Sequence, residues 1–265
     1  MDPNIPTAQQ ESAEIRPPLE TYESLSKLIE LSLTQPNLTV DQVLEGLRLA
    51  RSYDLAAAVV RPCDVDLAVR TLDGSGVAVA SVAGFPHGSS NTATKLYEGR
   101  DLLRRGAKEI ALVVNFGSLA ARQFQQVEME ILQMSESCHQ AGALCKVIFE
   151  NGYLANDLKV ILCRICKRCD VDFAETSTGF GPSADTISDL ALMKSILKDR
   201  VRMKASEFST FEQALEVYQA GCDRMQTTAP AAILDEWKRI LKEREEARKL
   251  EEAKLNQTQV QSDAS

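Results

Sequence analysis

The chain of 265 residues carries 30 basic and 38 acidic side chains, a formal net charge of −8 at neutral pH. That balance argues against broad binding to nucleic acid or to an anionic membrane surface. No apolar run reaches the roughly 18 residues that a membrane span needs, and the N-terminus has acidic residues and no signal-peptide core. We therefore expect a cytoplasmic protein with reduced thiols.

Short apolar runs alternate with amphipathic stretches along most of the sequence. Strands are expected at 28–33, 55–61, 77–83, 109–114, 144–150, 171–177, 201–206 and 222–227. Helices are expected at 39–54, 64–72, 91–106, 119–141, 155–168, 184–197, 210–221 and 229–251. This α/β pattern predicts a (β/α)8 TIM barrel with an eight-stranded parallel sheet in a single domain. A doubly wound open sheet is the alternative, but no glycine fingerprint follows the first strand.

The two ends of the chain differ in composition from the middle. Residues 1–20 are rich in Pro, Gln and Glu, and residues 252–265 are polar. Such segments cannot bury enough apolar surface to offset the entropy of ordering, so both are expected to be disordered tails. The barrel is expected to occupy residues 21–251.

Three charged side chains fall on the same face of their strands. Side chains alternate along a strand, so Lys146, Glu175 and Lys204 would point into the barrel from three neighbouring strands and meet near its top. Charges in a partly dry interior must be paired. Two explanations stay open: a structural ion-pair network, or a site in which each group tunes the proton affinity of the others.

A run of three cysteines, Cys163, Cys166 and Cys169, has a spacing that metal or cluster sites use. It lies within a helical pattern, no fourth ligand follows at the usual spacing, and the sequence has only two histidines, His87 and His139. We therefore expect these thiols to be packing residues, and no metal or cofactor is expected.

The stretches "GFPHG" (84–88), "CKVIFENGYL" (145–154), "TSTGFGP" (176–182) and "RMKAS" (202–206) resemble the deoxyribose-phosphate aldolase family. The resemblance extends over about residues 24 to 235. It implies a (β/α)8 barrel that cleaves 2-deoxyribose 5-phosphate into acetaldehyde and glyceraldehyde 3-phosphate through a Schiff base on a lysine. That step needs an uncharged amine, which a neighbouring cation helps to maintain.

The resemblance transfers unevenly to this sequence. It implies a Schiff-base lysine directly before the Thr-Ser-Thr-Gly run, where this chain has Glu175. The second family lysine and the fifth-strand lysine correspond to Lys204 and Lys146, whereas the proton-relay aspartate corresponds to Ala111. A carboxylate cannot form a Schiff base, and beside Glu175 the amine of Lys204 should be held protonated.

The implied phosphate site also departs from the family pattern. Two glycines of a phosphate-binding turn correspond to Glu207 and Phe208, where a carboxylate would repel an anion and a ring would fill space. The first-strand Asp and Thr of the family correspond to Glu30 and Ser32. The residues expected to contact a substrate are Glu30, Ser32, Asn115, Ser177, Arg202, Glu207, Thr227 and Thr228.

Three functions remain open on these grounds. The first is an enzyme repurposed for acid–base chemistry on a non-phosphorylated carbonyl compound, with Glu175, Lys204 and Lys146 as catalytic groups. The second is a catalytically inactive binding or scaffold protein. The third is a residual aldolase that uses Lys204 or Lys146 as nucleophile. The expected partners are a small carbonyl substrate and a second copy of the chain in a homodimer.

Overall fold

The eight strands form a closed parallel barrel in which each pairs with the next and β8 pairs with β1. The computed structural model describes residues 16–184, 186–206 and 208–263. The strands are β1 (Ile29–Leu33), β2 (Ala57–Val60), β3 (Ala78–Ala83), β4 (Glu109–Val113), β5 (Leu144–Ile148), β6 (Phe173–Glu175), β7 (Arg202–Ser206) and β8 (Arg224–Thr227). The predicted (β/α)8 barrel is confirmed.

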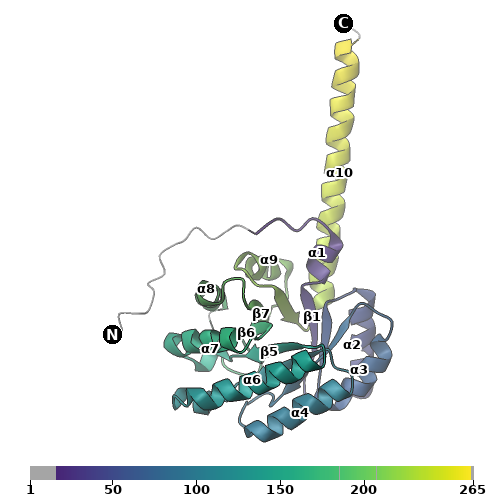
Figure 1. The fold of residues 1–265 in the computed structure, drawn as a ribbon. Coiled ribbons are helices and arrows are strands. Elements are labelled where there is room, and N and C mark those ends of the chain that lie inside the picture. Colours follow the sequence, from purple (N-terminus) through teal and green to yellow (C-terminus); the bar gives the residue numbers. More distant parts are fainter. Residues whose placement is uncertain (1–15, 185, 207, 264–265) are drawn as a thin grey trace.

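Helices surround the barrel (Figure 1). They are α1 (Tyr22–Ser26), α2 (Val40–Ser52), α3 (Val65–Leu72), α4 (Thr92–Arg104), α5 (Phe116–Ala120), α6 (Phe124–Gln140), α7 (Asn156–Arg168), α8 (Thr186–Leu197), α9 (Phe211–Gln219) and α10 (Pro230–Asp263). Short 3₁₀ turns, η1 (Pro62–Asp64) and η2 (Asn151–Tyr153), follow β2 and β5. No helix in the described part of the chain is both long and apolar enough to cross a membrane.

Two expected element boundaries were wrong. The helix expected at 119–141 is divided into α5 and α6, because Arg122 between them has a left-handed backbone with φ of 58°. Helix α10 continues to Asp263, whereas the sequence pattern ended it at residue 251. Its charged outer half is supported by ion pairs one turn apart, such as Arg239–Glu243 and Lys249–Glu245.

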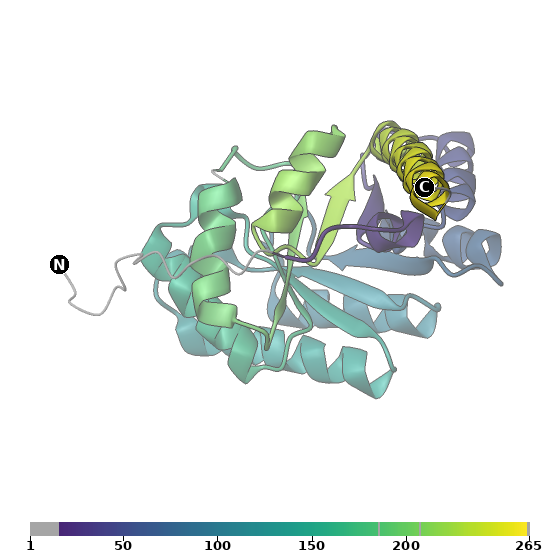
Figure 2. The ribbon, with the colours of Figure 1, turned by 90° about the horizontal axis from the view of Figure 1, so that it is seen from above.

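Residues 16–20 are held against the barrel, although the sequence suggested that they belong to a disordered tail. The guanidinium of Arg16 donates to the carbonyl oxygens of Cys222 and Gly221 and pairs with Asp223. Leu19 is buried, and its carbonyl oxygen accepts from Arg244 on α10. Residues 1–15 lie outside the described residues. Figure 1 shows α10 extending far beyond the barrel, and in Figure 2 the same helix is seen nearly end-on at the edge of the barrel.

The inside of the barrel has an apolar half and a charged half. Small apolar side chains from β2 to β5 form one cluster: Ala57, Val59, Ala80, Val82, Ala111, Val113 and Ile148. Charged side chains occupy the other half, mainly on β1 and β5 to β8. A separate, larger apolar core lies between the strands and the surrounding helices. Cys163 and Cys166 of α7 and Cys169 directly after it are buried in this core.

A buried ion pair joins α4 to α6. Lys95 is fully buried, and its Nζ lies 2.7 Å from Glu130 Oε1 and 2.8 Å from the carbonyl oxygen of Val113. The hydroxyl of Thr92 donates to the second Glu130 oxygen. Burial lowers the pKa of Lys95, and Glu130 opposes that shift. The ammonium therefore depends on Glu130 as its charged partner.

Replacing Glu130 with Ala should leave a buried charge without its partner. We expect the free energy of unfolding to fall by about 3–5 kcal/mol, measured by urea denaturation. The control is Glu128→Ala on the same helix, which breaks only the more exposed pair with Arg168 and should cost less than about 1 kcal/mol. An equal loss of unfolding free energy in the two variants would show that the buried pair stabilises the fold no more than the exposed pair does.

Candidate functional site

The charged half of the barrel interior holds a closed network of ion pairs. Its acidic members are Glu30, Glu109 and Glu175, and its basic members are Lys146, Lys204 and Arg224. All three glutamates and both lysines are buried. With every member ionised the charges cancel, which is the arrangement that makes burial of so many charges tolerable.

Lys204 on β7 connects two of the carboxylates. Its Nζ lies 2.9 Å from Glu30 Oε2 and 3.0 Å from Glu175 Oε1, and it donates to Gln226 Oε1 over 2.7 Å. Glu175 and Lys204 are register partners on β6 and β7, so both point into the barrel. Of these three contacts, the one with Gln226 is a hydrogen bond, and the contacts with Glu30 and Glu175 are ion pairs.

Lys146 on β5 contacts the other side of the network. Its Nζ pairs with Glu30 Oε1 and with Glu109 Oε2. Arg224 at the start of β8 lies 3.1 Å from Glu30 and 3.6 Å from Glu109. Lys146 makes no ion pair with Glu175 among the described contacts, so the predicted meeting of Lys146, Glu175 and Lys204 occurs through Glu30.

The pKa shifts in the network differ in sign. Burial raises the pKa of Glu175, and the charges of Lys204 and Lys146 only partly offset that rise. Burial would also raise the pKa of Glu30, but Lys146, Lys204 and Arg224 outweigh it and lower the pKa. Burial would lower the pKa of Lys204, but Glu175 and Glu30 outweigh it and raise the pKa. Of Glu30 and Glu175, Glu175 therefore takes up a proton first as the pH falls.

A pocket of about 320 Å³ opens at the C-terminal end of the strands, above the network. In a (β/α)8 barrel this is the end where ligands bind. Its lining comes from the C-terminal ends of β1, β7 and β8 and from the segments that follow β1, β6, β7 and β8: Ser32, Thr34, Gln35, Thr178, Gly179, Phe180, Ser206, Phe208, Ser209, Gln213, Gln226, Thr227 and Thr228.

Two of the lining residues connect the pocket to the buried charges. The hydroxyl of Ser206 donates to Glu175 Oε1 over 3.2 Å, and the amide oxygen of Gln226 accepts from Lys204. Glu175 itself is only 1 % exposed and is not among the lining residues. Its second oxygen, Oε2, is buried without a hydrogen-bond partner among the described residues. The carboxyl group of Glu175 is thus linked to the pocket by its hydrogen bond with Ser206.

Some of the residues predicted to bind substrate do reach this pocket. Ser32, Thr227 and Thr228 line it, and Glu30 lies in the network beneath. Asn115 instead caps α5, where its side chain accepts from the backbone of Ser118.

Ser177 and Arg202 are not among the residues that line the pocket. The hydroxyl of Ser177 accepts from the backbone of Gly179. Arg202 begins β7 at the opposite end of the barrel, where it lies over the ring of Phe173 at 4.0 Å and 3.6 Å from Asp172. Alternation along the strand correctly places Arg202 on the same face of β7 as Lys204. It does not show that Arg202 lies at the N-terminal end of the strand, away from the pocket. Glu207 is outside the described residues.

Sequence reasoning missed four members of the site, namely Glu109, Ser206, Arg224 and Gln226. A usable signal existed for all four, since Ser206 lies two residues after Lys204 and falls on the same face of its strand. Gln226 lies two residues after Arg224, and Glu109 two before Ala111, so the same alternation would place these residues inside the barrel. What the sequence did not contain was the register between β8 and β1, which places Gln226 beside Glu30.

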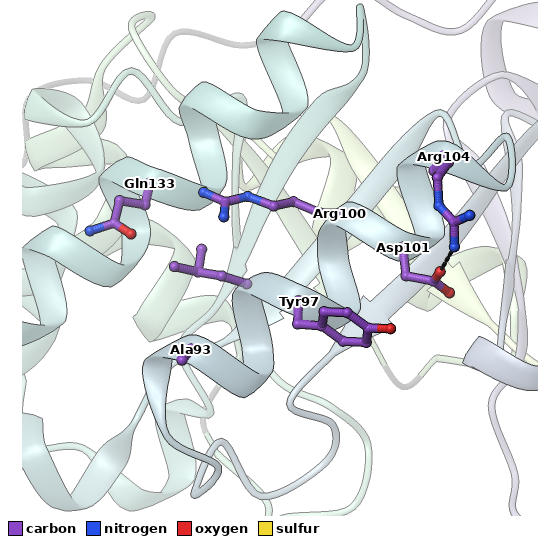
Figure 3. Close-up of a pocket in the computed structure, with 7 residues that line it drawn as sticks. Ala93, Tyr97, Arg100, Asp101, Arg104 and Gln133 are labelled. Carbon is purple, nitrogen blue, oxygen red and sulfur yellow. Dashed lines mark hydrogen bonds and ion pairs between the residues drawn. The ribbon is translucent and has the colours of Figure 1, made fainter.

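A larger hollow, of about 740 Å³, lies on the outer surface of α4 and α6. Figure 3 shows Tyr97, Arg100, Asp101 and Arg104 spread along α4, with Gln133 on α6. Tyr97 is 75 % exposed, and Asp101 pairs with Arg104 rather than facing a cavity. Because its polar groups do not converge, this surface lacks the features of a small-molecule site.

No group of His, Cys, Asp and Glu that could hold a metal occurs among residues 16–184, 186–206 and 208–263. Burial raises the pKa of the Cys163 thiol to about 12 and that of Cys169 to about 11. Both thiols are therefore protonated at neutral pH and behave as apolar packing groups.

Comparison with curated proteins finds relatives that match most of the chain, whereas comparison with family models does not. No family model matches the chain. A deoxyribose-phosphate aldolase of Caldanaerobacter subterraneus subsp. tengcongensis is 34 % identical over 222 residues, covering 83 % of this chain and 96 % of the relative. The deoxyribose-phosphate aldolase of Bacteroides thetaiotaomicron is 35 % identical over 223 residues, covering 84 % and 94 %.

Solved structures agree with the relatives. The tetrameric deoxyribose phosphate aldolase of Aeropyrum pernix superimposes with a TM-score of 0.77 at 25 % identity, covering 83 % of this chain and 93 % of that one. An aldolase called QR15 gives a TM-score of 0.77 at 30 % identity, covering 81 % and 96 %. With relatives this similar along nearly their whole length, the chain belongs to the deoxyribose-phosphate aldolase family.

Proposed function

We propose that this protein carries out acid–base chemistry on a small non-phosphorylated carbonyl compound without forming a Schiff base. Enolisation, cyclisation, dehydration and retro-aldol cleavage are the reaction types that such a site can support. The observation that carries the proposal is the pair formed by Glu175 and Lys204, connected to the pocket by Ser206 and Gln226.

The chemistry follows from the two protonation states. A buried carboxyl group with a raised pKa binds a proton more tightly than an ordinary carboxylate, so Glu175 can act as a base that accepts a proton and later returns it. A protonated Lys204 beside it supplies positive charge that stabilises an ionised Glu175 or an enolate. Ser206 would pass the proton, because its hydroxyl donates to Glu175 while it can accept from a group in the pocket.

The contacts of the two lysines argue against a residual Schiff-base aldolase. Both amines contact carboxylates, Lys204 with Glu30 and Glu175, and Lys146 with Glu30 and Glu109. A nucleophilic amine must lose its proton, and neighbouring carboxylates oppose that loss. The side chains of Lys146 and Lys204 are also at most 1 % exposed.

A catalytically inactive binding protein is the second candidate. It is favoured by the burial of Glu175, which reaches the pocket only through Ser206. Phe180 and Phe208 narrow the pocket without filling it. The first experiment below separates the two candidates.

We further propose that the protein acts in the cytoplasm, which suits seven cysteines that are all free thiols. Homodimer formation also stays a proposal. The Aeropyrum pernix relative is described as a tetramer, which makes measurement of the oligomeric state worthwhile.

Proton abstraction can be followed without knowing the product. In D₂O, we expect the protein to catalyse hydrogen–deuterium exchange next to the carbonyl of at least one member of a panel of non-phosphorylated aldehydes and ketones, observed by proton NMR. Glu175→Gln keeps the size of the side chain but removes the base, and should slow exchange by about 10²–10⁴-fold. The control is Glu128→Gln on the surface of α6. Exchange no faster than the buffer background would favour the binding protein.

Schiff-base chemistry should not be detectable. Incubation with 2-deoxyribose 5-phosphate and borohydride should leave Lys204 and Lys146 without a substrate adduct in peptide mass spectra, because both amines are held by carboxylates. The Caldanaerobacter aldolase, treated in the same way, is the positive control. An adduct on Lys204 would overturn the proposed non-covalent route.

Glu175 should titrate above the ordinary carboxyl value of 4.5. The carboxyl ¹³C resonance that disappears in Glu175→Gln identifies it, and its midpoint is read from a pH series. A raised pKa means that the folded state binds the proton more tightly than the unfolded state. Wild-type stability relative to Glu175→Gln should therefore decline as the pH rises from 4.5 through the folded pKa. A midpoint below 4.5 would contradict the assignment of Glu175 as the proton-exchanging group.

A further inference from the structure

The charged groups beneath the pocket are not available to bind an anion. Lys204 is fully buried, its charge is paired with Glu30 and Glu175, and it donates a hydrogen bond to Gln226. Arg224 lies deeper, on Glu30 and Glu109, and Arg202 lies at the other end of the barrel. No Lys, Arg, Asp or Glu lines the pocket within the described part of the chain.

Four backbone donors around the rim are also occupied, those of Gly179, Phe180, Ser209 and Ala229. The N–H groups of Gly179 and Phe180 donate to the hydroxyls of Ser177 and Thr178. Past β7, the N–H of Ser209 donates to Gln213 Oε1. Past β8, the N–H of Ala229 donates to Thr227 Oγ1, and the first residue of α10, Pro230, has no N–H. Phosphate binding uses free N–H groups of this kind, so these four N–H groups are not available to an anion.

The polar groups that do face the pocket are uncharged and joined to one another. The hydroxyls of Thr34 and Ser32 lie 3.0 Å apart, and the amide of Gln226 donates to Ser32 over 3.3 Å. Lys204 and Glu175 continue this chain to the hydroxyl of Ser206, which lines the pocket again. The pocket therefore offers hydroxyl and amide groups that can each donate or accept, which suits a ligand bearing several hydroxyls.

Two rings provide an apolar surface beside these groups. Phe180 is 40 % exposed and packs edge-on against Phe85 at 5.3 Å, while Phe208 is buried. The cavity volume of about 320 Å³ equals that of roughly ten water molecules at ~30 Å³ each. Bonded atoms need less room than separate water molecules, so a compact ligand of about ten or more non-hydrogen atoms fits in that space.

We propose that the ligand of this pocket is an unphosphorylated sugar, a neutral polyhydroxylated aldehyde or ketone of about five carbons, bound by Ser32, Thr34, Ser206 and Gln226 with its C–H face against Phe180. That the sugar carries a reactive carbonyl group rests on the proposed function. That the pocket binds a neutral polyhydroxylated molecule does not rest on it. It predicts that a phosphate ester is discriminated against, because the ester adds an anion that no basic side chain in the described lining of the pocket neutralises.

Binding is tested on the full chain by saturation-transfer NMR titration with ribose and 2-deoxyribose, their 5-phosphates, and cyclohexanone. We expect both free pentoses to bind, and the 5-phosphates and cyclohexanone to bind at least about tenfold more weakly. A 5-phosphate that binds as well as its free sugar, or cyclohexanone binding more tightly than the pentoses, would overturn the inference.

Two variants probe the hydroxyl contacts separately. Thr34→Val, which has the same shape and does not touch Glu175, and Ser206→Ala should each weaken pentose binding by about threefold to tenfold. Ser137→Ala, on the outside of α6, is the matched control and should bind like the wild type. Unchanged affinity in both pocket variants would show that these hydroxyls do not contact the sugar.

Glu175→Gln separates this inference from the proposed function. It should keep pentose binding, because the Gln oxygen can still accept from Ser206, while losing proton exchange. Pentose binding without exchange in the wild type would retain the ligand and reject the acid–base chemistry. Glu175-dependent exchange on another carbonyl compound, without pentose binding, would do the reverse.

Discussion

The arrangement of charge inside the barrel depends on one constraint, which is that buried ions must be neutralised nearby. Glu30 satisfies most of that requirement, because it contacts Lys146, Lys204 and Arg224 together. Glu175 and Glu109 supply the remaining negative charge. A lysine at position 175 would leave four cations against two carboxylates in the same space, so the acid at this position and the surrounding pairs form one interdependent set.

That interdependence explains why the site should be understood as a network rather than as isolated catalytic groups. The proton affinity of Glu175 is set by its burial and by the charges of Lys204, Lys146 and Glu30. Lys204 is held in its charged form by two carboxylates, so it can stabilise negative charge but is poorly suited to attack a carbonyl. Ser206 and Gln226 then connect this buried set to the pocket with neutral groups.

The apolar layers that stabilise the barrel and the pocket at its C-terminal end occupy different parts of the structure. The apolar half of its interior, from Ala57 to Ile148, and the outer core between strands and helices need no charge. The pocket lies at the other end of the strands from Arg202, whose stacking on Phe173 helps to close the opposite end of the barrel. Loops after β6, β7 and β8 thus vary the chemistry of the rim without disturbing the apolar layers.

The sequence by itself determined the barrel and much of its charged interior. Alternating apolar runs and amphipathic segments are local patterns, and the two-residue period of a strand was enough to turn Lys146, Glu175 and Lys204 inward. The tertiary structure alone decided which charges meet, because contacts between β1, β4 and β8 depend on closure and register. It brought Arg224 to Glu30 and Glu109 to Lys146, left Arg202 at the far end, and gave Asn115 a capping role. Depth along a strand and the partner across a closed barrel are long-range properties, and a periodic pattern along one strand carries no information about them.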